Sequence, residues 1–216
     1  MNAVVFDFDG TIADSFNVIV EIAYELTKRE QLADINHALE MRLNHQSLNQ
    51  TAKLLKIPRW QWPWLLNRGR KIMARDLHKI PLIKGMDEVF KQLKANHYEL
   101  FVVSSNSKAN VERFLAEKEL AGYFQNISGG VGLFDKSRAI KRLMRDNKLK
   151  NDSIIYVGDE VRDIVAAKQL NIPCIAVGWG YNSEALLARY SPTVLVNSPT
   201  QLVDAISECE KYKSAS

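Results

Sequence analysis

The 216-residue sequence has few of the residues that build disulfide or metal frameworks. Its only two cysteines, Cys174 and Cys209, do not make a disulfide framework or a cysteine-based zinc site, and Cys174 lies in an apolar run where a buried thiol is expected. The four histidines lack metal-ligand spacing. No apolar run approaches the roughly 18 residues that cross a membrane, and Met1 leads into an apolar segment rather than a cationic leader. We expect a soluble, cytoplasmic protein without a membrane partner.

A strong charge of one sign is also missing. Lys and Arg exceed Asp and Glu by only 29 to 25, and no dense basic run occurs, so we expect no nucleic-acid partner. Residues 14–80 hold 11 Lys and Arg against 7 Asp and Glu, whereas the rest of the chain balances at 18 against 18. A positive lobe over an anion site would favour phosphorylated ligands. Basic residues scattered over an exposed surface are, however, the preferred explanation of this charge excess.

Short apolar runs alternate with helical patterns over most of the chain. This alternation predicts an α/β fold, with a doubly wound, Rossmann-like parallel sheet. The runs expected as strands are 3–8, 99–104, 153–157, 173–177 and 193–196. The segments expected as helices are 87–95, 108–118, 136–147, 161–170 and 183–189.

Residues 14–80 break this alternation. Their apolar residues recur at helical spacing, and no convincing strand is visible. We therefore expect an all-helical lobe inserted after the first strand, with Pro81 and Gly85 marking the return to the core. The predicted division is an α/β core of residues 1–13 and 81–216 and a helical lobe of residues 14–80.

The first chemical motif is Asp7-Phe8-Asp9-Gly10-Thr11, at the end of the first apolar run. Open α/β sheets place their ligands at the carboxyl ends of the strands, and Gly10 permits a sharp turn there. Two carboxylates beside one metal suit phosphoryl transfer, because one can attack phosphorus while the other moves a proton to the leaving oxygen. A calcium loop is disfavoured, since its twelfth position is Val18 rather than Glu. An ordinary acidic turn stays open on this motif alone.

A second strand-like run, 154–158, also ends in acid. Asp159 and Asp163 are one helical turn apart and can face the same site. Magnesium prefers a few carboxylates together with waters and substrate oxygens. Asp7 and Asp159 can hold such an ion, and Asp163 can orient a bound water or ligand. Helix capping explains Asp159 and Asp163 about equally well when they are taken alone.

Together the two motifs resemble those of the haloacid dehalogenase-like superfamily of phosphohydrolases. Residues 7–15 are similar to its first motif, and residues 157–163 resemble its fourth. A helical insert directly after the first motif is similar to the C1-type cap of phosphoglycolate phosphatase-like members. The resemblance implies a magnesium-dependent phosphatase that hydrolyses a small phosphorylated metabolite, as a monomer or homodimer.

The resemblance also implies roles for further residues. The phosphate-binding hydroxyl of the second motif is expected at Ser105, with Ser104 left open, and the adjacent Asn106 is also expected to contact the phosphate. The third-motif lysine is expected at Lys136, with Arg138 as the alternative because Ser137 replaces a frequent proline. Glu160 departs from the small hydroxyl residue common after the fourth-motif Asp, and would hold an outer water or lie in solvent.

The implied mechanism begins with attack by Asp7 and formation of an aspartyl-phosphate. Asp9 protonates the leaving alcohol and then activates water, and Ser105 and Lys136 neutralise the phosphate oxygens. The implied ligands of Mg²⁺ are Asp7, Asp159, Asp163 and the backbone carbonyl of Asp9, with Gly10 and Thr11 beside the phosphate. A sugar-phosphate mutase is the enzymatic alternative, and a non-catalytic binding module on the same fold is the other.

The substrate is not specified by the motifs. Trp60, Trp62 and Trp64 form an aromatic cluster in the helical lobe. They could form the floor of a pocket for an organic leaving group, but burial in a small core of the lobe is the favoured interpretation.

Overall fold

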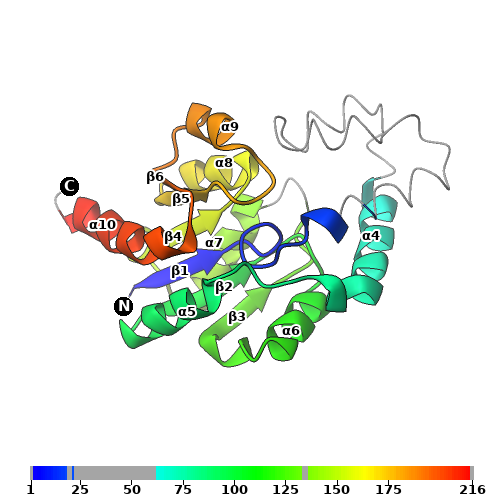
Figure 1. Ribbon diagram of the computed structural model, residues 1–216. Helices are drawn as coiled ribbons and strands as arrows, with labels where there is room; N and C mark the ends of the chain where they lie inside the picture. Colours follow the sequence, from blue (N-terminus) through cyan, green and yellow to red (C-terminus); the bar gives the residue numbers. More distant parts are fainter. Residues whose placement is uncertain (1, 19–20, 22–61, 133–135, 215–216) are drawn as a thin grey trace.

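The computed structural model describes residues 2–18, 21, 62–132 and 136–214. In this part of the chain, six parallel strands form one sheet in the order β3-β2-β1-β4-β5-β6 (Figure 1). The strands are β1 (Ala3–Phe6), β2 (Glu99–Val103), β3 (Phe124–Ser128), β4 (Ile154–Gly158), β5 (Cys174–Val177) and β6 (Val194–Val196). The first strand is therefore central, and β2 and β4 pair with it on either side.

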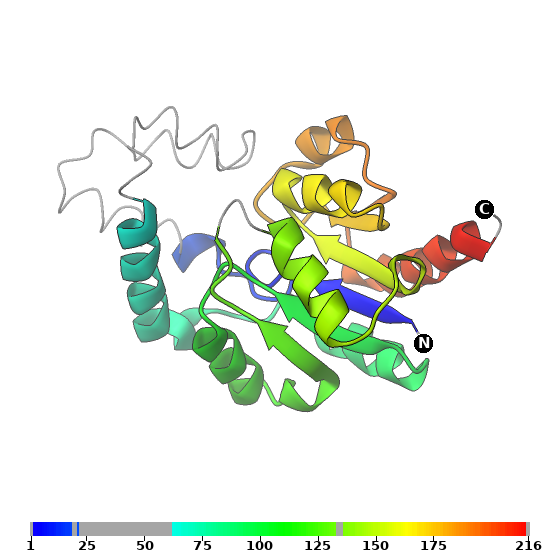
Figure 2. The same ribbon diagram turned by 180° about the vertical axis from the view of Figure 1, so that it is seen from behind.

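Helices cover both faces of this sheet (Figures 1 and 2). They are α5 (Met86–Ala95), α6 (Lys108–Glu117), α7 (Lys136–Asp146), α8 (Val161–Gln169), α9 (Glu184–Arg189) and α10 (Leu202–Ser214). Because side chains alternate along a strand, Val4 and Phe6 pack in the core with Phe90 of α5 and Phe114 of α6. Their neighbours Ala3 and Val5 pack in the opposite core, with helices α7, α8 and α9.

The predicted α/β class is confirmed, and each of the five predicted strands is present. The sixth strand, β3, was not predicted. It lies at the edge of the sheet, beside β2, and its Gln125 and Asn126 are exposed. Phe124 and Ile127 pack against the core, but no residue of β3 is fully buried. Such a strand carries no continuous apolar run, so its sequence looks like a loop.

The inserted segment leaves the core after β1 and returns before α5. Its described part contains a helix, α4 (Trp62–Asp76), and a short 3-10 turn, η2 (Leu77–Lys79). The outgoing and returning chains pair: the Asp14 amide donates to the Pro81 carbonyl at 2.9 Å, and Ala13 forms a bridge with Leu82. This contact lies at the predicted boundary between core and lobe, but the division at residues 13 and 81 stays a prediction, and residues 22–61 lie outside the described residues.

The structure bears on two expectations from the sequence, a buried thiol at Cys174 and the lack of a membrane-spanning segment. Cys174 and Cys209 are both buried thiols. Burial raises the pKa of the Cys174 thiol well above its usual value. Within the described ranges, no helix is both long enough and apolar enough to cross a bilayer.

Candidate active site

The predicted site residues meet at the carboxyl ends of three adjacent strands. Asp7 and Asp9 follow β1, Ser105 follows β2, and Asp159 follows β4. Since all the strands are parallel, these ends lie at one edge of the sheet. The three aspartates are almost completely buried there. The folding of the sheet therefore brings together side chains that are more than 150 residues apart in sequence.

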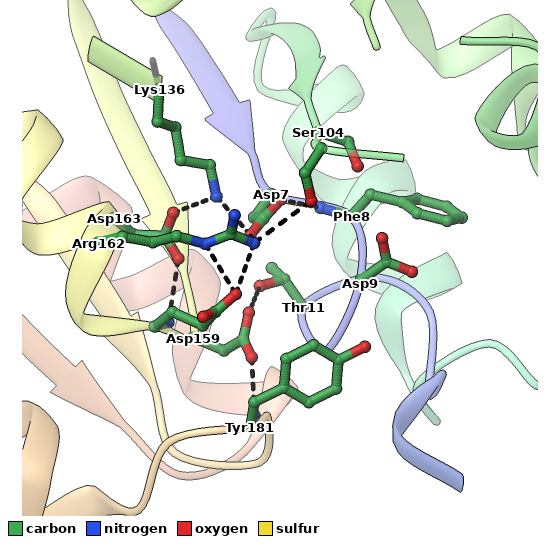
Figure 3. Close-up of polar contacts among 12 residues, drawn as sticks. Asp7, Phe8, Asp9, Thr11, Ser104, Lys136, Asp159, Arg162, Asp163 and Tyr181 are labelled. Atoms are coloured by element: carbon green, nitrogen blue, oxygen red, sulfur yellow. Dashed lines mark hydrogen bonds and ion pairs between the residues drawn. The ribbon is translucent and has the colours of Figure 1, made fainter. Parts of the chain in front are cut away.

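Asp7 accepts hydrogen bonds at both carboxylate oxygens (Figure 3). The Phe8 amide donates to Oδ1 at 2.8 Å, and Lys136 Nζ donates to Oδ2 at 2.5 Å. Lys136 begins α7 and also donates to Asp163. Burial alone would lower the pKa of Lys136, but the charges of Asp163 and Asp7 outweigh it and raise that pKa. Arg138, the other candidate, is exposed, so the geometry favours Lys136 as the cation beside Asp7.

Asp159 is held by two loops on either side of it. Thr11 Oγ1 donates to one carboxylate oxygen at 2.8 Å, and the Tyr181 amide donates to the other at 2.7 Å. Glycines let both loops approach: a Cβ at Gly10 would lie 2.2 Å from Asp159 Oδ2, and one at Gly180 would lie 2.2 Å from Asp159 Cβ. Gly10 also has a φ of +79°, which disfavours any other residue. The Thr11 hydroxyl thus binds an aspartate, although it was expected beside the phosphate.

Asp7, Asp159 and Asp163 form a cluster that could hold a metal ion. Each offers a carboxylate oxygen, and these oxygens lie within 4.8 Å of one another. Burial raises the pKa of Asp159 well above its usual value, and the charge of the neighbouring Glu160 adds to this shift. A divalent cation would relieve this repulsion, and an all-oxygen donor set suits a hard cation such as magnesium.

Asp9 lies outside this cluster and has its own partners. Its Oδ1 accepts a hydrogen bond from Ser15 Oγ at 3.0 Å and from Asn106 Nδ2 at 3.4 Å. Ser15 Oγ in turn lies 2.5 Å from the buried Tyr181 hydroxyl. Burial and the neighbouring charge of Asp7 raise the pKa of Asp9 to about 6. A carboxyl group with such a pKa can both donate and accept a proton near neutral pH.

The two serines after β2 have different environments. Ser104 is fully buried, and its Oγ accepts a hydrogen bond from the Asn106 amide at 2.9 Å. Ser105 is partly exposed, and its Oγ lies 3.5 Å from Arg162 Nη2. The Ser105 hydroxyl is thus beside a cation that also approaches Asp7, which favours Ser105 over Ser104 as the phosphate-binding residue.

Arg162 is a site residue that the sequence analysis did not identify. Its Nη2 lies 2.6 Å from Glu160 Oε1 and 4.0 Å from Asp7 Oδ2. Glu160 is only 2% exposed, so the expectation that it lies in solvent is wrong. Burial raises the pKa of Glu160, and Arg162 opposes that shift. The sequence signal was present, since Glu160 and Arg162 stand between Asp159 and Asp163, but nothing in the spacing shows that they pair.

Helix α4 of the inserted segment reaches the same edge of the core. Arg70 Nε and Nη2 donate to the Ser105 carbonyl at 3.0 and 2.7 Å, and Asn110 Nδ2 donates to the Arg70 carbonyl at 3.0 Å. At least one basic residue of the lobe therefore lies beside the predicted phosphate site. Trp64, expected in a core of the lobe, is 47% exposed with the Arg68 guanidinium over its ring, while Trp60 and the Trp62 side chain lie outside the described residues.

The family model for haloacid dehalogenase-like hydrolases matches residues 4–177, which include the four aspartates of the site and Lys136 but not Gly180 and Tyr181. The chain belongs to the haloacid dehalogenase-like hydrolases. This confirms the predicted family. Together with the phosphatase relatives described next, it also confirms the predicted enzyme class, a phosphoric monoester hydrolase. Catalytic roles of individual residues stay predictions, because membership alone does not test them.

Two curated relatives of this hydrolase cover nearly its whole length. A phosphoglycolate phosphatase of Synechococcus elongatus is 30% identical over 208 residues, which are 96% of this chain and 98% of that protein. A phosphoglycolate phosphatase of Vibrio vulnificus is 26% identical, over 94% and 95% of the two chains. Among solved structures, a predicted phosphatase from Clostridium acetobutylicum is similar with a TM-score of 0.82 and 25% identity, covering 96% and 98% of the two chains.

Proposed function

We propose that this hydrolase removes phosphate from a small-molecule phosphomonoester, with magnesium and through an aspartyl-phosphate on Asp7. The observation that carries the proposal is the environment of Asp7. Its carboxylate is buried at the centre of the sheet edge, hydrogen-bonded by Lys136 and by the Phe8 amide, within the acidic cluster. A buried carboxylate that is held this way is oriented for attack on a neighbouring group.

Asp7, Asp159 and Asp163 would hold the magnesium ion, and the family resemblance adds the Asp9 carbonyl. When bound, the ion supplies positive charge that draws electron density from the phosphate. The Thr11 hydroxyl and the Tyr181 amide occupy the two oxygens of Asp159 and so fix its orientation. Such supporting hydrogen bonds typically change metal affinity by about 10- to 100-fold when they are removed.

The two chemical steps are carried by Asp7 and Asp9. An oxygen of Asp7 forms a bond to phosphorus as the bond to the leaving oxygen breaks, and Asp9 gives that oxygen its proton. Asp9 then accepts a proton from a water molecule that attacks the aspartyl-phosphate, which releases phosphate and restores the Asp7 carboxylate. Because Ser15 and Asn106 both donate to Asp9 Oδ1, its Oδ2 is the oxygen available for the proton.

The substrate is proposed from the relatives and from the charge of the site. Similarity to the Synechococcus phosphoglycolate phosphatase extends over 96% of this chain and 98% of that protein, which supports phosphoglycolate or another small phosphorylated acid. Arg70 of the inserted segment supports an anionic ligand, because it contacts the loop that carries Ser105. We propose that the segment of residues 14–80 selects the substrate and excludes bulk water.

The proposal is tested by phosphate release from a panel of esters, with magnesium and with excess chelator. The esters are phosphoglycolate, hexose phosphates and nucleoside monophosphates, and pyrophosphate is added as an anhydride for comparison. We expect release from at least one ester, with phosphoglycolate among the fastest, and a loss of at least about 100-fold when the metal is removed. No release from any ester would contradict the phosphatase, and a subsequent test with a bisphosphate activator would examine the mutase.

A substitution at Gly180 tests the metal site without altering any carboxylate. We expect Gly180→Ala to displace Asp159, since the new Cβ would lie 2.2 Å from Asp159 Cβ, and to raise the magnesium concentration for half-maximal activity by about 10-fold or more. Gly122→Ala is the matched control, because no heavy atom beyond Gly122 and its neighbours in the chain lies within 4 Å of its added Cβ. An equal magnesium requirement in the two variants would show that the position of Asp159 does not govern metal binding.

A further inference from the structure

Arg162 projects from the first turn of α8 into the space between the nucleophile and the loop after β2 (Figure 3). Its Nη2 atom lies 4.0 Å from Asp7 Oδ2 and 3.5 Å from Ser105 Oγ. A phosphoryl group attacked by Asp7 and bound by Ser105 must have oxygens in this same region. Arg162 is therefore placed where it can contact those oxygens.

Glu160 fixes the direction in which the guanidinium points. Its Oε1 accepts from Arg162 Nε at 2.9 Å and lies 2.6 Å from Nη2. Glu160 is 2% exposed, and the side chain of Arg162 is only 16% exposed. A planar guanidinium that is held at one edge presents its remaining N–H groups in a fixed direction, which suits phosphate oxygens.

The negative charge of the site favours a second cation at the position of Arg162. The buried carboxyl groups of the site are Asp7, Asp9, Asp159, Glu160 and Asp163, and two of them, Asp7 and Glu160, form ion pairs with Arg162. Among the described residues, the cations in direct contact with this group are Lys136 and Arg162. A phosphate that approaches so many carboxylates is repelled. Lys136 is already shared between Asp7 and Asp163, so a second cation facing the phosphate lowers that repulsion.

We propose that Arg162 is a second phosphate-binding cation of this enzyme, aimed at the transferred phosphoryl group by Glu160. The inference rests on the proposed function and extends it, since it assigns a phosphate ligand beyond Ser105 and Lys136. A purely structural role is the competing explanation: Arg162 would then only neutralise the buried Glu160. The two explanations differ in what happens when both residues are replaced.

The test compares the wild type with Arg162→Met, Arg162→Lys and the double variant Glu160→Gln/Arg162→Met. Calorimetric titration with inorganic phosphate, in the presence of magnesium, measures phosphate affinity, and thermal unfolding measures stability. For Arg162→Met we expect phosphate affinity to fall by about 30- to 100-fold, with a smaller loss for Arg162→Lys, which keeps the charge without the planar group. Arg162→Met also leaves Glu160 buried and unpaired, so its melting temperature should fall.

The double variant decides between the two explanations. We expect it to recover stability, because no unpaired buried charge is left, while phosphate affinity stays as low as in Arg162→Met. Wild-type phosphate affinity in the double variant, or in Arg162→Met itself, would overturn the assignment. The proposed function is tested separately, by ester hydrolysis. If it failed, the wild type would hydrolyse no ester, whereas its phosphate affinity could still depend on Arg162.

Discussion

Replacing Asp7 with Asn is expected to lower phosphate release by at least about 10⁴-fold, the scale on which loss of a nucleophile acts. Asparagine has nearly the same shape, but its amide does not attack phosphorus. The Phe8 amide can still donate to the side-chain oxygen, which it now contacts at 2.8 Å. The measurement is single-turnover phosphate release at saturating magnesium, with the substrate that is fastest for the wild type.

The same variant should keep its fold. Lys136 retains its ion pair with Asp163, so the buried lysine is not left without a partner. We expect the melting temperature of Asp7→Asn to stay within about 5 °C of the wild-type value. A folded Asp7→Asn protein that releases phosphate at one tenth of the wild-type rate or faster would remove the covalent mechanism.

Replacing Asp9 with Asn is expected to lower turnover by about 10²- to 10⁴-fold, the range for loss of a general acid and base. Burial and the charge of Asp7 raise the pKa of Asp9 to about 6, so its carboxyl group is suited to both proton transfers. The amide of asparagine transfers no proton. Ser15 can still donate to its side-chain oxygen, so the position of the group should be retained. The measurement is turnover as a function of magnesium concentration.

Asp159→Asn is the matched comparison for that experiment. Asp159 belongs to the acidic cluster, whereas the carboxylate of Asp9 does not. We therefore expect Asp159→Asn to weaken magnesium affinity by at least about 10-fold, and Asp9→Asn to leave it within about 3-fold. If Asp9→Asn lost magnesium affinity as severely as Asp159→Asn, the role assigned to the Asp9 side chain would be wrong.

The part of the site predicted from sequence consists of residues that directly follow buried strands. The runs before Asp7 and Asp159 are apolar enough to identify as central strands, and the geometry of a parallel sheet then brings their carboxyl ends together. Neither acidic motif was decisive by itself, because turns and helix caps also use aspartate. Two such motifs in one α/β chain were informative, because both must lie at the same edge.

The contacts that were missed join side chains that no spacing in the sequence pairs. The Tyr181 hydroxyl lies 2.5 Å from Ser15 Oγ across 166 positions of sequence. Glu160 and Arg162 are near each other in sequence, but their burial follows from the packing of α8 against the ends of the strands. Edge strand β3 was missed for a related reason, because its exposed residues carry no apolar pattern.

The central claim is that phosphate passes through a covalent bond to Asp7. The most direct test is to quench the enzyme during turnover and to reduce the quenched protein with borohydride. The peptide that contains residues 3–13 is then sequenced by mass spectrometry. An aspartyl-phosphate is reduced to homoserine, so we predict homoserine at position 7 only when substrate and magnesium are both present. Rapid hydrolysis with unmodified aspartate at position 7, or with homoserine at another acidic residue, would contradict the account.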